Sequence, residues 1–203
     1  MRNAHAVLAA VSLLFVTAAQ GDDFQQGLDA YNSADYETAL VKWQLPADAG
    51  DANSQFGLGQ MYGNGFGVMM DDAQAIKYYG LAAEQGHAQA QCNLAVMHQN
   101  GWGVPRSDEE AARLFTLAAE QGVTEAQIAM GRMLAMDFSE DYDPVQAYKW
   151  FSIAALFEDI DAGVKQDTVA AKMTPEQITE GDALVKQWSE SHKELLATHL
   201  SNY

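Results

Sequence analysis

Few residues in this sequence have types and spacing that could perform chemistry. Apart from His5 near the N-terminus, the histidines are His87, His98, His192 and His199, and Cys92 is the one cysteine. His192 and His199 lie seven residues apart and could share a helix face, but no third ligand is evident and a metal site needs three or four. Cys92 has no cationic neighbour to activate its thiol, so we expect it to be buried and inert. These residues predict no catalytic group, metal or cofactor.

An acidic segment, residues 137–143, is the other place where chemistry is conceivable. It holds Asp137, Glu140, Asp141 and Asp143, but without the spacing of a calcium-binding loop. Asp143 is in a position to cap the next helix, and nothing in the sequence supplies an acid/base environment for a carboxylate pair. We therefore expect a protein that is not an enzyme. Weak cation binding here, and a role as the accessory subunit of an enzyme, are the alternatives.

The elements that position these residues repeat every 36 positions. The segment 82–86, Ala-Ala-Glu-Gln-Gly, recurs unchanged at 118–122. Other positions recur in three or four units: the alanines 39, 75, 111 and 147, the aromatics Trp43, Tyr79, Phe115 and Phe151, and the glutamines 55, 91 and 127. Such a gapless period indicates a stack of identical supersecondary units.

Each unit is predicted to form two helices joined by a glycine-containing loop. Apolar residues at helical spacing mark the first helix, as in residues 52–62. Asp71, Ser107 and Asp143 each precede a Glu or Gln by three residues, which is the signature of a helix N-terminus. The second helices are predicted to end at Gly50, Gly86 and Gly122, because glycine readily takes the left-handed conformation that follows a helix.

The predicted fold is all-α: an α/α solenoid of about four helix pairs with a C-terminal capping segment. Residues 22–158 hold the repeats, of which 24–50 is a shortened first unit. Residues 159–203 depart from the period, and the segment Thr174-Pro175-Glu176-Gln177 predicts the start of one long amphipathic helix that continues through Leu195 and Leu196. Because an array must cover its last apolar face, this tail is expected to be a cap.

The pattern resembles the Sel1-like repeat, a relative of the tetratricopeptide repeat. The resemblance is carried by Ala88-Gln89-Ala90-Gln91-Cys92-Asn93-Leu94-Ala95, by Gly101-Trp102-Gly103-Val104, by 118–122, and by Leu58-Gly59-Gln60-Met61-Tyr62 in the preceding unit. It implies a scaffold that binds other proteins. The fourth unit departs from the pattern, since Asp137 and Ser139 replace its two loop glycines.

The N-terminus resembles a secretory signal. Arg2 is followed by an apolar run over 6–19 and by small residues at Ala19 and Gly21, which predicts cleavage after residue 21 and a periplasmic or secreted protein. Removing this segment removes one base and no acid, so the mature chain is one unit more negative than the formal charge of −17. That charge disfavours nucleic acid and favours a basic protein or peptide. No later segment of the sequence is apolar enough to span a membrane.

Recognition is expected where the repeat varies. In the first helices a stripe of variable residues should line the concave face of the stack, which is the usual binding surface of a solenoid. It comprises Phe56, Gln60, Val96, Gln99, Ile128 and Arg132. The alternative is that part of this stripe packs against neighbouring units.

A second variable series lies between the loop glycines. Phe66, Trp102 and Phe138 are aligned 36 residues apart and would form a row of aromatics along the loop edge. If exposed, they would anchor a partner or a component of the cell envelope such as a glycan or peptidoglycan, because aromatic residues dominate binding hot spots. The alternative is that they fold back onto the adjacent loop.

Overall fold

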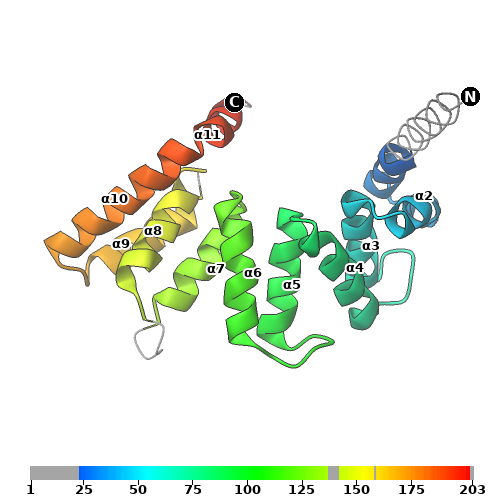
Figure 1. The fold of residues 1–203 in the computed structure, drawn as a ribbon, viewed down its shortest axis with the longest axis horizontal. Coiled ribbons are helices and arrows are strands. Elements are labelled where there is room, and N and C mark those ends of the chain that lie inside the picture. Colours follow the sequence, from blue (N-terminus) through cyan, green and yellow to red (C-terminus); the bar gives the residue numbers. More distant parts are fainter. Residues whose placement is uncertain (1–22, 137–141, 158, 202–203) are drawn as a thin grey trace, which may run out of the picture. The chain divides into compact units, whose positions relative to one another are not determined.

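The computed structural model describes residues 23–136, 142–157 and 159–201, and every regular element in this part of the chain is a helix (Figure 1). The helices form two compact units. One contains the chain up to Ala90 together with Trp102–Pro105, and the other contains Gln91–Gly101 and the chain from Arg106 onward. Within each unit, helices that follow one another in the sequence pack side by side. This is the predicted α/α solenoid class.

The first unit is built from a helix over 23–32 and from α2 (Tyr36–Asp48), α3 (Ala52–Asn64) and α4 (Asp72–Glu84). A turn at Ala34, whose φ is +62°, joins the first two of these helices. Helix α5 (Ala88–Asn100) begins in this unit and continues in the second.

The second unit continues with α6 (Asp108–Glu120) and α7 (Thr124–Leu134), then α8 (Pro144–Ala155) and α9 (Ile160–Ala170). Helices α10 (Pro175–Ser191) and α11 (Lys193–Leu200) complete it.

The predicted helix boundaries are confirmed at both ends. Asp71, Ser107 and Asp143 accept hydrogen bonds from the backbone N–H three residues on, at 3.0, 3.1 and 3.0 Å. Each bond satisfies one of the donors that a helix N-terminus leaves open. At the other end, Gly50, Gly86 and Gly122 have φ of +97°, +85° and +88°. These local signals set the length of each helix.

Rings from the second helix of a pair pack directly on glycines of the first. A Cβ added to Gly59 on α3 would lie 2.5 Å from a ring carbon of Tyr79 on α4, and one added to Gly131 on α7 would lie 2.6 Å from Phe151 on α8. Tyr79 and Phe151 are both buried. The aromatic series found in the sequence is thus the core, and the glycines allow the helices to approach closely.

The repeated glutamines are buried and form hydrogen bonds with the preceding helix or with a later glutamine. Gln55 donates to the carbonyl of Ala47 at 3.0 Å and accepts from Gln85 at 2.7 Å. In the next repeat Gln121 donates to Gln91 at 2.8 Å. Gln127 donates to the carbonyl of Ala119 at 3.1 Å. Gln55 and Gln127 therefore satisfy a carbonyl of the preceding helix, and Gln55 and Gln91 also bond to the glutamine 30 residues later, which gives these positions a structural role.

The C-terminal segment differs from the prediction in two respects. The helix register does not end at residue 158, because α9 begins 36 residues after α7 and Ala162 is fully buried like Ala90 and Ala126. The expected single long helix is broken at His192, where φ is −117° and ψ is 29°. The hydroxyl of Ser191 and the imidazole of His192 both contact the carbonyl of Trp188, at 2.8 Å each. Side chains that compete for helical carbonyls in this way favour a helix end.

The predicted capping role of the tail agrees with its packing. Thr174 and Gln177 form the capping box that opens α10, and α10 packs against α8. Met173 and Ile178 cover a core of Ala147, Tyr148 and Phe151. In the described ranges, no helix combines the length and apolarity that crossing a membrane requires.

Candidate binding sites

In the first unit, the predicted binding stripe is partly used for packing. Phe56 is half-buried and stacks on the imidazole of His87, with ring centroids 4.5 Å apart, and it also contacts the ring of Tyr79 at 5.9 Å. Gln60 is half-buried and one turn further along α3. Phe56 therefore has structural partners that account for its aromatic side chain.

In the second unit, the residues of the predicted stripe lie in different environments. Ile128 packs against the core of α8 and α9, and Arg132 forms an exposed ion pair with Asp161 at 3.7 Å. Val96 is half-buried on α5. Gln99 lines a cavity of about 430 Å³. Of the four, Gln99 is the one that borders a space large enough to receive another molecule's side chain.

Three methionines of one helix end define this cavity, which we call the methionine groove. Met130 is buried, Met133 is half-buried and Met136 is 57% exposed. The hydroxyl of Thr116 contacts the sulfur of Met130 at 3.7 Å. The rim is polar, and Arg106 is held there by two hydrogen bonds to Asp108, at 3.1 and 2.8 Å. The complete lining is Gln99, Arg106, Asp108, Glu109, Ala112, Met130, Met133, Leu134 and Met136.

The groove lies where the repeat pattern fails. In the two preceding repeats the first helix has 13 residues and ends in an asparagine, Asn64 or Asn100, which bonds back to a carbonyl of the last turn at 2.9 or 2.8 Å. Met136 occupies that position in the next repeat, and α7 has 11 residues. Met133 recurs 36 residues after Met97 and 72 after Met61, so the period marks it as a core position, whereas Met136 has no methionine counterpart. The replacement of the helix-ending asparagine by Met136 is the feature of the sequence that marks this site.

The predicted row of loop aromatics is not uniform. Phe66 stacks on Tyr36, with centroids 4.9 Å apart and planes 7° from parallel, and it meets the edge of Tyr31. Trp102, one repeat later, is 52% exposed. The residue 36 positions after Tyr36 is Asp72, which offers no ring, and Gly103 packs on it instead. Phe138 lies outside the described residues.

The other candidates for chemistry are Cys92, the acidic segment 137–143 and possible metal ligands. Cys92 is buried, and burial together with the charge of Glu125 raises the pKa of its thiol to about 12, so the thiolate is scarce at neutral pH. Of the acidic segment, 137–141 lies outside the described residues, and Asp143 caps α8. Among the residues that the structure describes, no three His, Cys, Asp or Glu side chains are grouped to hold a metal ion.

His87 has a specific structural task at the start of α5. Its Nδ1 accepts a hydrogen bond from the backbone N–H of Ala90 at 3.2 Å, which is the place that Asp51 takes at the start of α3. Burial lowers the pKa of His87 below its ordinary value of 6.5, more than nearby groups raise it. The neutral imidazole is needed because a protonated Nδ1 cannot accept a hydrogen bond.

We expect acidification to destabilise the protein through His87. As the pH falls below 6.5 the unfolded chain binds a proton before the folded one, so stability that is fully present above pH 6.5 is lost as the pH falls toward the lower folded-state pKa. Urea unfolding near pH 7 and near pH 5.5 measures this loss. The His87→Asp variant keeps an acceptor and should lose less stability between the two pH values. An equal loss in both proteins would contradict this role.

Comparison with known proteins identifies the repeats. The model of the Sel1 repeat matches residues 52–87, 88–123 and 124–156, which is just over half of the chain. A Sel1 repeat protein from Oxalobacter formigenes is similar in structure, with a TM-score of 0.65 and 29% identity over 69% of this chain and 58% of that one. A search of the curated proteins found no match.

A second solved structure shows the same fold at lower identity. It is c5321, a protective antigen present in uropathogenic Escherichia coli strains that displays an SLR fold, with a TM-score of 0.54 and 23% identity over 90% of this chain. This chain spans about half of that protein's length, 48%. Sel1 repeats generally mediate protein–protein interaction and are typically non-catalytic scaffolds. The period, the helix pairs and the matched residues agree: the chain belongs to the Sel1 repeat family.

Proposed function

We propose that this protein is an exported scaffold that binds a protein or peptide, with an apolar side chain of the partner seated in the methionine groove. The observation that carries the proposal is the groove itself, which has apolar walls, a polar rim and a volume of about 430 Å³. Methionine side chains are flexible and polarizable, and they adapt to apolar side chains of different shape. Gln99 at the rim supplies a polar contact, as expected for a residue of the variable stripe.

The negative charge of the chain favours a partner that carries basic residues. The formal net charge is −17, and Asp108 and Glu109 stand at the rim of the groove. A partner segment that places a basic residue beside its apolar anchor would meet both features. We propose that the electrostatic attraction raises the rate of association, while the groove supplies the specificity.

The test compares two exposed methionines. Met136→Lys adds a positive charge to the groove and should reduce capture of the partner from envelope extract at least about tenfold, since a charge buried among apolar groups is costly and repels a basic partner. Met69→Lys is the matched control, because Met69 is 89% exposed and lies in the first unit, outside the groove lining. Partners are identified by mass spectrometry, and binding is then measured with the purified partner. Equal binding by the parent and the Met136→Lys variant would contradict the proposal.

Export is part of the same proposal and has its own test. We propose cleavage after Gly21 and a periplasmic or secreted location, supported by the charge and apolar run of residues 1–21. Cell fractionation with mass measurement of the N-terminus should find a chain that begins at Asp22 outside the cytoplasm. A cytoplasmic chain that retains residues 1–21 would contradict export and would leave the groove proposal standing.

The exposure of Trp102 favours a second candidate function. A half-exposed indole on a loop can stack on a sugar ring or anchor a partner, so the protein would bind a component of the envelope through this residue. Trp102→Ala should then reduce retention on isolated envelope material, whereas Phe66→Ala should alter stability through its stacking on Tyr36.

A further inference from the structure

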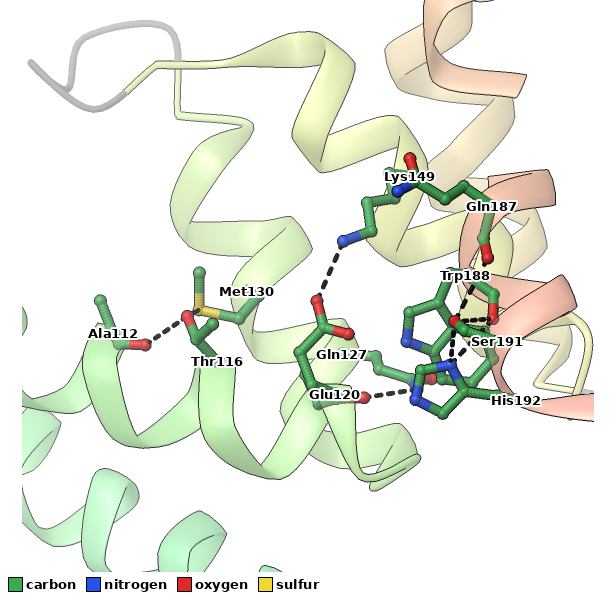
Figure 2. A network of polar contacts seen from close by, with 11 residues as sticks. Ala112, Thr116, Glu120, Gln127, Met130, Lys149, Gln187, Trp188, Ser191 and His192 are labelled. Carbon is green, nitrogen blue, oxygen red and sulfur yellow. Dashed lines mark hydrogen bonds and ion pairs between the residues drawn. The ribbon is translucent and has the colours of Figure 1, made fainter. Parts of the chain in front are cut away.

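The C-terminal helix α10 forms a second cavity together with the repeats. This cavity has a volume of about 270 Å³ and is lined by Glu120 at the end of α6, Lys149 on α8, and Leu184, Gln187, Trp188 and Ser191 on α10. Its acid and its base, Glu120 and Lys149, come from two different helices and form an ion pair. Figure 2 shows Glu120, Lys149 and Trp188 converging from three helices.

Lys149 is held between two partners. Its ammonium lies 3.2 Å from Oε1 of Glu120 and 3.8 Å from the ring centroid of Trp150. The Lys149 side chain is 13% exposed and that of Glu120 is 45% exposed. An ammonium has three donors and a carboxylate can accept at both oxygens, so each group retains capacity for a further hydrogen bond. The cation–π contact fixes the ammonium at the cavity wall.

Trp188 brings a buried donor to the same place. The residue is 4% exposed, and its indole nitrogen has no hydrogen-bond acceptor among the described residues. In Figure 2 the edge of the ring that carries this nitrogen is turned toward Glu120. Buried donors in proteins are rarely left without an acceptor because the loss is costly. The indole N–H is therefore a buried donor that is not hydrogen-bonded within the described residues.

Gln127 adds a buried acceptor beside this cavity. It is fully buried and donates to the carbonyl of Ala119, next to Glu120. Its Oε1 has no partner in the described part of the chain. In the earlier repeats the matching oxygen accepts from Gln85 or Gln121, but the residue 36 positions after Gln121 is Phe157. The last repeat thus leaves one buried oxygen, Oε1 of Gln127, without the glutamine donor that the earlier repeats supply.

We propose that this cavity binds a zwitterionic ligand of amino-acid size, such as a free α-amino acid with an apolar side chain. Its carboxylate would accept from Lys149 and from the indole N–H of Trp188, and its ammonium would donate to the free oxygen of Glu120. The side chain would lie against Leu184. A lone anion is repelled by Glu120 and a lone cation by Lys149, so the pair selects ligands that carry both charges.

The experiment follows the indole resonances of the protein by nitrogen-15 NMR. The chain has four tryptophans, and the Trp188→Phe variant identifies the signal of Trp188. Titration with L-leucine should move this signal saturably at millimolar concentrations or below. The two singly charged analogues, 4-methylpentanoate and 3-methylbutylamine, should bind at least about tenfold more weakly, as expected when one charge-assisted hydrogen bond is lost.

Matched variants separate the cavity from general charge effects. Glu120→Gln and Lys149→Met should each weaken L-leucine binding at least about tenfold. Glu84→Gln, one repeat before Glu120, and Lys77→Met, two repeats before Lys149, make the same changes outside the cavity and should leave L-leucine binding unchanged. Lys149 is nearly buried, so folding of its variant is checked by circular dichroism, and the conservative Trp188→Phe variant provides an independent measure by calorimetry, with the same tenfold loss expected.

Two results would overturn the proposal. One is the lack of a saturable shift with all three compounds, which means that the cavity holds water only. The other is an equal response to 4-methylpentanoate and L-leucine, which means that the site is a simple anion site. Neither result bears on the methionine groove, because the two cavities have no lining residue in common.

Discussion

Replacing Gly59 with valine is expected to reduce the free energy of unfolding by about 3 kcal/mol, at the upper end of the usual cost of overpacking. A Cβ at Gly59 would lie 2.5 Å from Cδ1 and 2.7 Å from Cε1 of Tyr79. That ring is buried, so it has little room to move away. Alanine occupies the corresponding position of the next repeat, Ala95, so one carbon is accommodated there, but valine adds two more.

Gly80 provides the matched control for this prediction. It also lies inside a helix, α4, but a Cβ added there would meet no atom within 4 Å. Gly80→Val should therefore change stability by no more than about 0.5 kcal/mol. The two variants share the same change in helix propensity. The difference between their urea midpoints therefore measures the destabilisation caused by the clash with the ring of Tyr79. If both variants unfolded at the same midpoint, close contact with the ring would not explain the glycine.

Replacing Gln55 with leucine is expected to cost about 2 kcal/mol, because it removes two hydrogen bonds of a buried side chain. Gln55 is 3% exposed. It donates to the carbonyl of Ala47 and accepts from Gln85. The amide of Gln85 can still donate to the carbonyl of Leu81, at 3.2 Å. The carbonyl of Ala47 can still accept from the backbone N–H of Gly50, at 3.0 Å, so the expected cost is that of the two lost side-chain bonds.

The same change at Gln127 should cost less, about 1 kcal/mol or below. Gln127 donates to the carbonyl of Ala119, but its own Oε1 is buried with no partner in the described residues. Leucine removes that unsatisfied oxygen along with the bond, and the two effects offset each other. Chemical denaturation of both variants measures the difference. Equal losses would show that the glutamine oxygens contribute nothing to the repeats.

The two cavities share a structural origin. Each lies where one repeat departs from the residues that complete its neighbours. The methionine groove begins where Met136 stands in place of Asn64 or Asn100, and the cavity at α10 lies beside Gln127, where Phe157 stands in place of a glutamine. Positions that repeat unchanged build the scaffold, so departures from the period are the natural places for binding.

The amino-acid sequence by itself determined the helix pairs and their ends. Asp71, Ser107 and Asp143 cap helices through atoms three residues away, and the terminal glycines act within one turn. These interactions are local, so they can be read from spacing. The 36-residue period then identified the aromatic core, because residues that recur in a stack occupy equivalent positions.

Tertiary structure decided which of the other residues are available for binding. Phe66 and Trp102 look equivalent in the sequence, but Phe66 stacks on Tyr36 whereas Trp102 is half-exposed. The difference lies in the residue 30 positions earlier, which is an aromatic, Tyr36, in the first case and Asp72 in the second. The recurring glutamines proved to be structural through partners on other helices. Both cavities combine side chains from three helices. Such arrangements depend on how whole helices pack, which no local spacing records.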